Sequence, residues 1–290
     1  MSRRHVEVEL SGGLANQLFQ WSAGRVLADE HGVPLILDAS LVCRPDGRGL
    51  QVDRLSDHER LVEPGELTRR LWSSAHRWLP RVPLGLVKRI ALRRPRATRR
   101  CGDLRAARVV LGSGRSPRLA GLFQEPDLLF AQRENIRERV RTRLPAGGAV
   151  ASLPENYAAV HIRRGDYVSN EKYRRLFGVC SEQYFRRAIR RLDPSLPIAF
   201  VSDDPAWCRS FATSLGFPAH RILPPSGNDH FDDLATIARA KEVVLSNSTF
   251  SWWGVYLGEP VTVICPEPWF TERSRDRGLV LPGWIRVPRD

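Results

Sequence analysis

Several absences narrow what this 290-residue chain can be. Its five cysteines are scattered and include no Cys-x-x-Cys pair, so we expect reduced, mostly packed thiols rather than a zinc knuckle or a disulfide framework. No uninterrupted apolar run reaches the roughly 18 residues that a spanning helix needs, and no N-terminal signal segment is recognisable. We therefore expect a cytoplasmic globular protein, with contact at the inner face of the membrane peripheral at most.

Lysine is also scarce, because it occurs only at positions 88, 172 and 241, yet the net charge is +13. Nearly all of the positive charge is therefore arginine, whose planar fork donates two parallel hydrogen bonds to a phosphate. Such a basic chain can bind nucleic acid, an anionic membrane surface or an anionic substrate. The alternative is that many surface arginines reflect codon usage and carry no function.

The sequence predicts alternating strands and helices, as in a doubly wound α/β fold. Strand 6–10, a glycine turn, a helix from about residue 14 to 30 and strand 33–38 form a βαβ unit, which implies a parallel sheet. After residue 157 the pattern returns, with strands expected at 158–162, 198–202, 243–245 and 261–264 and helices at 181–192, 205–215, 231–241 and 251–257. A Pro-Ala-Gly-Gly stretch at 145–148 follows a predicted helix at 132–143, so we expect one domain over 1–152 and another over 153–290.

The composition shifts between about residues 68 and 100, where arginines mix with leucines and tryptophans and prolines interrupt the pattern. The simpler interpretation is a basic helical insertion in the first domain with a solvated face. The alternative is a patch that contacts an anionic membrane surface or an acceptor substrate.

Polar or glycine-rich residues follow four of the predicted strands. Ligands bind beyond the carboxyl ends of the strands in an open parallel sheet, so a site is expected in these loops. The loops are 11–17, 163–166, 203–205 and 246–249. Gly12-Gly13 lets a backbone approach a ligand or a facing helix, but it is not a Gly-x-Gly-x-x-Gly fingerprint, and a nicotinamide cofactor is not expected.

The pair Arg163-Arg164 is the most specific local signal. Two guanidiniums at the mouth of a parallel sheet can clamp a diphosphate and neutralise the charge that develops on a nucleoside diphosphate leaving group. Along an extended strand, His161 and Arg163 point to one side and Arg164 to the other. One arginine of the pair can therefore serve the fold instead, by pairing with a carboxylate such as Asp166.

The loops at 203–205 and 246–249 each open a predicted helix. Hydroxyls and free N–H groups at a helix N-terminus form an anion site, and Asp203 or Asp204 can accept hydrogen bonds from guanine. The alternative for both loops is plain N-capping. Paired aspartates can also bind a metal, but no histidine or third carboxylate is near them in the sequence, and no metal is expected.

In this order and spacing, four segments resemble those of bacterial α-1,2-fucosyltransferases of glycosyltransferase family 11. They are GGLANQLFQ (12–20), HIRRGDYV (161–168), FVSDDPAWC (200–208) and SNSTFSWWG (246–254), with weaker agreement at 121–124 and 266–270. The resemblance spans nearly the whole chain. The sequence departs from the family pattern at Ala15, where glycine is usual, and segment 68–100 matches nothing in that pattern.

The resemblance implies a GT-B fold, with two Rossmann-like domains facing across a cleft and GDP-fucose held mainly by the second. It implies inverting, metal-independent transfer of fucose to the 2-hydroxyl of a glycan acceptor, such as a terminal galactose, with no cofactor. Arg163 is expected on the β-phosphate, and the other donor contacts are expected from Gly12, Gly13, Asn16, His161, Arg164, Asp203, Asp204, Ser246, Asn247, Ser248 and Thr249.

The acceptor hydroxyl must lose its proton during transfer. Asp166 and Glu171 follow the arginine pair closely in the sequence, and either carboxylate can serve as the base. The alternative for each is an ion pair with a neighbouring arginine. Two other functions stay open. A transferase on the same scaffold would use another nucleotide sugar, whereas a nucleic-acid-binding protein would need a continuous basic stripe, usually with stacking aromatics. We expect GDP-fucose and a glycan as partners, and no nucleic acid.

Overall fold

The structure is a computed structural model that describes residues 4–43, 47–56, 59–63, 98–146, 148–218, 221–223, 229–272 and 278–290. The chain forms two compact units, Met1–Arg139 (unit 1) and Val140–Asp290 (unit 2). This division falls before the expected boundary at residue 152 and within helix α6 (Arg133–Arg141). The basic insertion expected at about 68–100 lies outside the described residues up to residue 97, so its role stays a prediction. No helix in the described part of the chain is long and apolar enough to cross a membrane.

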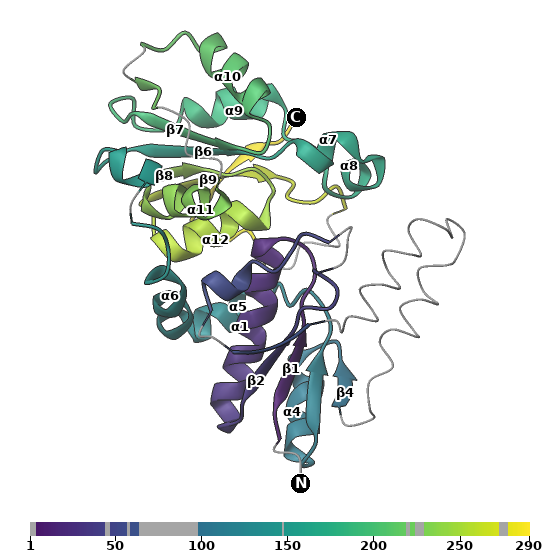
Figure 1. Ribbon diagram of the computed structural model, residues 1–290. Helices are drawn as coiled ribbons and strands as arrows, with labels where there is room; N and C mark the ends of the chain where they lie inside the picture. Colours follow the sequence, from purple (N-terminus) through teal and green to yellow (C-terminus); the bar gives the residue numbers. More distant parts are fainter. Residues whose placement is uncertain are drawn as a thin grey trace. The chain divides into compact units, whose positions relative to one another are not determined.

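Unit 1 is built on a parallel sheet of five strands in the order β3-β2-β1-β5-β4 (Figure 1). The strands are β1 (Val6–Glu9), β2 (Leu35–Asp38), β3 (Arg60–Val62), β4 (Thr98–Cys101) and β5 (Ser116–Leu119). Helix α1 (Leu14–His31) lies so close to the sheet that a Cβ at Gly24 would be 2.3 Å from a methyl of Val8. The other helical elements described in this unit are η1 (Val52–Arg54), α4 (Leu104–Gly112) and α5 (Pro126–Ala131).

Unit 2 is built on a second parallel sheet of five strands, in the order β10-β9-β8-β6-β7. The strands are β6 (Ala158–Ile162), β7 (Ile198–Ser202), β8 (Glu242–Val244), β9 (Thr262–Glu267) and β10 (Ile285–Pro288). Helices α9 (Glu182–Ile189) and α10 (Pro205–Ser214) cover one side of this sheet, and α11 (His230–Arg239) and α12 (Thr249–Gly258) cover the other (Figure 1). The predicted strands and helices of this half are confirmed, with shifts at their ends. The sequence did not predict η2 (Gly148–Ser152), α7 (Gly165–Ser169), α8 (Glu171–Phe177) or β10.

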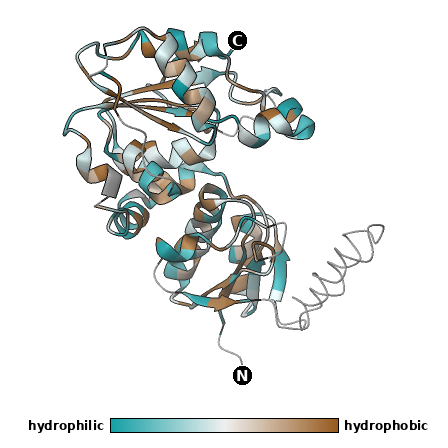
Figure 2. Cartoon of the chain, turned by 45° about the horizontal axis from the view of Figure 1, so that its top comes forward, coloured by the Kyte–Doolittle hydropathy of each residue, from teal (hydrophilic) through white to brown (hydrophobic). Residues whose placement is uncertain are grey.

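The alternation of side chains along β6 decides what each side of the sheet receives. The even-numbered residues of β6 join an apolar core with Phe185 of α9 and Phe211 of α10. His161 points to the other side, where its ring centroid lies 5.6 Å from that of Phe250 in α12. The strands of this sheet are mostly hydrophobic (Figure 2). The chain's five cysteines are free and four of them are buried, in agreement with the prediction of packed thiols.

Candidate functional site

The loops after β6, β7 and β8 form the candidate site in unit 2. From β6 the chain first adds β7 on one side and later β8, β9 and β10 on the other, so the strand order reverses between β6 and β8. Open α/β sheets bind ligands outside the carboxyl ends of the strands at such a reversal. Three of the four predicted site loops are therefore brought together here. The fourth, at residues 11–17, belongs to unit 1.

Arg163 follows β6 and lies between two carboxylates. One terminal nitrogen is 2.6 Å from Asp166 Oδ1, and the other is 3.0 Å from Asp203 Oδ2. The guanidinium also lies 5.5 Å from the ring centroid of Tyr167. A guanidinium has more N–H groups than these two ion pairs use, and the Arg163 side chain is 23% exposed. The side chain is therefore oriented by its neighbours and still has donors for a phosphate.

Gly165 allows the loops after β6 and β7 to approach each other. A Cβ at this position would lie 2.4 Å from Asp203 Oδ2, so a larger residue would displace the carboxylate that pairs with Arg163. The other oxygen of Asp203 accepts a hydrogen bond of 2.8 Å from the backbone N–H of Arg164. Asp203 thus binds both the side chain of one arginine and the backbone of the next.

Arg164 makes a separate set of contacts with α10. Its Nε lies 3.2 Å from Asp204 Oδ2, and its guanidinium lies 4.3 Å from the centroid of a Trp207 ring. Asp204 also caps α10 by accepting a 3.1 Å hydrogen bond from the backbone N–H of Trp207. The ion pair and the cation–π contact join the β6 loop to α10. These contacts favour the structural alternative for Arg164 and the capping alternative for Asp204.

The ion pairs of Arg163 and Arg164 form a cluster whose net charge is negative, which disfavours binding of an anion unless some of these pairs open. Two arginines and three aspartates (Asp166, Asp203 and Asp204) give 2 − 3 = −1. A diphosphate that binds here therefore competes with the carboxylates for Arg163. Displaced from Arg163, Asp203 would be available to accept hydrogen bonds from a ligand.

His161 is buried at the end of β6, where its Nδ1 lies 2.8 Å from the hydroxyl oxygen of Ser246. Burial, with a smaller contribution from the charge of Arg163, lowers the pKa of His161 from 6.5 to about 3. The imidazole is therefore neutral at physiological pH. Its Nδ1 forms a hydrogen bond with Ser246, and its other nitrogen can form one with a neutral partner. The ring does not supply positive charge to a phosphate.

The buried histidine should make the chain less stable in mild acid. His161 is protonated below about pH 6.5 in the unfolded chain but only below about pH 3 in the folded chain. Its contribution to the free energy of unfolding is therefore fully present above pH 6.5 and is lost as the pH falls below that value. We expect wild type to lose about 2 kcal/mol more free energy of unfolding between pH 7.5 and pH 5 than His161→Gln. Urea denaturation of both proteins at the two pH values measures this difference, and equal losses would contradict a buried neutral His161.

The loop after β8 turns one of its polar side chains into the fold. Asn247 is buried, and its amide nitrogen donates to the carbonyl oxygens of Phe177 at 2.7 Å and Trp269 at 3.1 Å. Its amide oxygen accepts a hydrogen bond from the thiol of Cys180, with 3.5 Å between sulfur and oxygen. Burial raises the pKa of that thiol to about 12. The backbone oxygen of Asn247 accepts a 3.3 Å hydrogen bond from the Tyr167 hydroxyl. The side chain of Asn247 therefore holds loops together.

Ser248 and Thr249 stand at the start of α12. Ser248 is the N-cap and accepts a 3.3 Å hydrogen bond from the backbone N–H of Phe250, which agrees with the capping alternative. A capping hydroxyl keeps its own proton, so Ser248 can still donate to an anion. The helix N-terminus adds a favourable potential for negative charge.

The two candidate bases both carry ion pairs. Asp166 is held by Arg163, and Glu171, the first residue of α8, pairs with Arg175. The side chains of Glu171 and Arg175 are 62% and 78% exposed, so this pair costs little to open. Within the described residues, no group of three or more His, Cys, Asp or Glu side chains is placed to hold a metal ion.

The turn after β1 in unit 1 holds the other predicted site residues. Gly12 has φ +75°, a conformation that favours glycine, and Gly13 is the N-cap of α1. Asn16 lies in the first turn of α1 and accepts a 3.1 Å hydrogen bond from the side chain of Gln124. The turn is thus set up by its own backbone and by the loop after β5.

Residues 110–287 match glycosyl transferase family 11, and this segment is more than half of the chain. The chain belongs to glycosyl transferase family 11. The resemblance read from the four segments is therefore confirmed, and the protein is a glycosyltransferase. All the predicted site residues of unit 2 lie within the matched segment, and the Gly12 turn precedes it.

Two relatives of this family 11 chain differ in the sugar that their names give. An α-1,2-colitosyltransferase of Escherichia coli is 26% identical over 98% of this chain and 99% of its own length. A galactoside α-(1,2)-fucosyltransferase 2 of Bos taurus is 28% identical over 56% of this chain and 49% of its own length. Among solved structures, POFUT1 in complex with GDP superposes with a TM-score of 0.51 at 16% identity, covering 89% of this chain and 97% of the other. The structural likeness shows the fold, which is of the GT-B type, as predicted.

The roles that the family pattern gives to single residues stay predictions. The structure brings the loops after β6, β7 and β8 to one end of the unit 2 sheet. It separates side chains engaged by their neighbours, such as that of Asn247, from those that have further donors, such as that of Arg163. Tyr167 and Trp207, which carry contacts of the two arginines, were not predicted. The sequence does show an aromatic residue four positions after Arg163 and another three positions after Asp204. Only the tertiary contacts reveal that these rings lie against the two guanidiniums.

Proposed function

We propose that this family 11 chain transfers L-fucose from GDP-fucose to the 2-hydroxyl of a glycan acceptor, such as a terminal galactose. The observation that carries the proposal is Arg163, held by two carboxylates at the strand-order reversal of unit 2 and still able to donate to a phosphate. Asp203, which Arg163 would release, is the group we propose for guanine. The names of the fucosyltransferase relatives support the choice of sugar.

The proposed reaction inverts the anomeric carbon. The acceptor oxygen forms a bond to that carbon, the bond from carbon to the β-phosphate oxygen breaks, and its electron pair leaves with GDP. Arg163 stabilises the charge that develops on the phosphate, so we propose that no metal is needed. The acceptor proton passes to a base, for which we propose Glu171, because Asp166 would first have to leave Arg163.

A second donor is favoured by one comparison. The α-1,2-colitosyltransferase matches nearly the full length of this chain, so a colitosyl donor is the alternative to GDP-fucose. Both donors would use the same arginine and differ in the contacts to the sugar.

A transfer assay in EDTA tests the proposal and separates these donors. The purified chain is incubated with a β-galactoside and, in parallel, with GDP-fucose, GDP-mannose and a colitosyl donor, and the products are analysed by NMR. An α-1,2-linked fucosyl product with GDP-fucose is expected. If only the colitosyl donor reacts, the proposed transferred sugar is colitose instead of fucose. Absence of transfer from all three donors by well-folded protein would overturn the proposal.

A further inference from the structure

Helices α7 and α8, with the glycine that follows them, form residues 165–178 beyond one end of the unit 2 sheet, and we call this stretch the α7–α8 segment (Figure 1). It carries Asp166, which pairs with Arg163, and Glu171, the proposed base. Neither of these short helices contains a buried residue, so an apolar face does not fix them in place. Their position depends instead on specific contacts.

Side chains that follow three strands bind the last carbonyl oxygens of α8, which have no partner within the helix. Asn247, after β8, and Arg289, after β10, each donate a 2.7 Å hydrogen bond to the carbonyl oxygen of Phe177. The hydroxyl of Thr271, after β9, lies 2.6 Å and 2.7 Å from the carbonyl oxygens at positions 175 and 176. The end of α8 is thereby joined to the loops after β8, β9 and β10.

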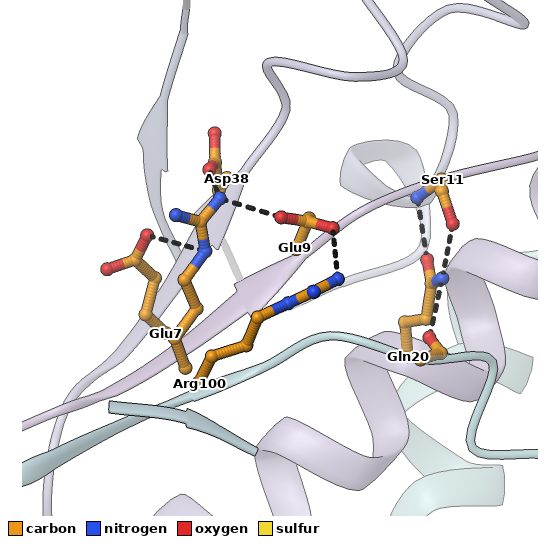
Figure 3. A network of polar contacts seen from close by, with 8 residues as sticks. Glu7, Glu9, Ser11, Gln20, Asp38 and Arg100 are labelled. Carbon is orange, nitrogen blue, oxygen red and sulfur yellow. Dashed lines mark hydrogen bonds and ion pairs between the residues drawn. The ribbon is translucent and has the colours of Figure 1, made fainter. Parts of the chain in front are cut away.

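Arg289 is the buried charge among these three residues. It is 9% exposed, and it forms no ion pair with any carboxylate in the described part of the chain. The contrast is Arg118 of unit 1, whose side chain is 11% exposed and pairs with three carboxylates, those of Glu7, Glu9 and Asp38 (Figure 3). A buried guanidinium is costly unless its donors are used, and the donor that Arg289 uses goes to the end of α8.

Gly178 allows the guanidinium to reach this position. It has φ +71°, a conformation that favours glycine, and a Cβ there would lie 2.6 Å from Arg289 Cζ. The backbone of Arg289 is fixed as well. Its N–H donates a 2.9 Å hydrogen bond to the carbonyl oxygen of Glu267, and its own carbonyl oxygen accepts one of 3.0 Å from the N–H of Ser181. Arg289 therefore links the edge of the sheet to α8.

Phe177 carries this link to the candidate site. Its ring stacks on that of Tyr167, with 4.9 Å between the centroids and 9° between the planes. Tyr167 in turn lies beside the Arg163 guanidinium and donates its hydroxyl to the backbone oxygen of Asn247. A shift of Phe177 would therefore move α7 and α8 relative to Arg163.

We propose that Arg289 is a positioning residue for transfer, because it holds the end of α8 and thereby fixes Glu171 relative to Arg163. The inference rests on the proposed function, since it takes Glu171 as the base and Arg163 as the partner of the phosphate. Arg289 acts through the carbonyl group of Phe177 and needs no contact with the substrate.

Kinetics and hydrogen exchange of Arg289→Met test this role. Methionine keeps an unbranched apolar stem but has no N–H donor for α8. We expect kcat for transfer from GDP-fucose to fall about 10-fold, while the dissociation constant of GDP changes less than about 3-fold, because Arg163 and its partner Asp203 lie outside the segment. Amide exchange followed by mass spectrometry should become faster in residues 165–178 and stay unchanged in β6 to β9.

Arg286→Met is the matched control. Arg286 lies on β10, and its side chain is 51% exposed and pairs with Glu267 instead of α8, so this variant should behave as wild type in all three measurements. Thr271→Val removes an exposed hydroxyl from the same end of α8. It should change kcat and exchange in the same direction as Arg289→Met, to a smaller extent.

The measurements distinguish positioning from a general effect on the fold. Faster exchange throughout unit 2, a loss of GDP affinity as large as the loss of kcat, or a kcat equal to that of Arg286→Met would each overturn the inference. An inactive wild type would instead mean that the proposed function is wrong, and the exchange of residues 165–178 would still show whether Arg289 holds α8.

Discussion

Replacing Arg163 by alanine is expected to lower the rate of transfer by about 100- to 1,000-fold, which corresponds to roughly 3–4 kcal/mol. The side chain is the cation we propose to bind the diphosphate, and its removal leaves Asp166 and Asp203 facing the same site without it. Affinity for GDP should fall together with the rate, because the phosphate loses its partner and meets two carboxylates. Calorimetry with GDP and single-turnover transfer measure the two effects separately.

Two other arginines of unit 2 are controls for this substitution. Arg186→Ala removes the same group from a pair with Glu182, in which the two side chains are 27% and 49% exposed and lie 2.7 Å apart, and should leave both measurements unchanged. Arg164→Ala should lower the stability more than the affinity, because its contacts go to Asp204 and Trp207. An Arg163→Ala protein that binds GDP as wild type does would contradict the assignment of the phosphate site.

Replacing Asn247 by alanine is expected to lower the free energy of unfolding by about 3 kcal/mol. The substitution removes the side-chain donor of the Trp269 carbonyl oxygen and one of the donors of the Phe177 carbonyl oxygen, which also accepts from Arg289, and it removes the acceptor of the Cys180 thiol. Transfer should fall as well, because these bonds fix the loop between Ser246 and the start of α12. Urea denaturation of the full chain measures the stability.

Asn170→Ala is a matched control for this substitution. Asn170 is an exposed asparagine that caps α8 by accepting a 3.3 Å hydrogen bond from the backbone N–H of Tyr173. Its loss should cost only about 1 kcal/mol. If Asn247→Ala cost no more than Asn170→Ala but abolished binding of GDP, the side chain would contact the ligand rather than the fold.

The sequence predicted strands β1 and β2 of unit 1 and β6 to β9 of unit 2, because hydrophobic strands and their polar ends are local patterns. The Val6 and Val8 alternation and the buried run at 158–162 each gave a strand, and the capping glycine at Gly32 ended α1 where expected. The short helices α7 and α8 were missed because they contain no buried residue and so carry no apolar period. Strands β3, β4, β5 and β10 were also missed, because only their pairing with neighbouring strands identifies such short segments.

The direction of each polar side chain could not be predicted from the sequence. Asn247 was expected among the donor contacts because it follows a strand, yet its amide nitrogen binds carbonyl oxygens at positions 177 and 269, which only the fold brings there. The same applies to the arginine pair. The pattern showed that one of them could serve the fold by pairing with Asp166. Arg163 makes that ion pair, whereas Arg164 contacts Asp204 and Trp207.

The central claim is that unit 2 binds a guanosine diphosphate group through Arg163, and calorimetric titration of the full chain with GDP in EDTA tests it most directly. ADP and UDP, titrated under the same conditions, are the comparison. The account predicts binding of GDP in the absence of metal, with a dissociation constant in the micromolar range, and much weaker binding of the other two nucleotides. Equal affinity for all three, or no binding of GDP by well-folded protein, would contradict it.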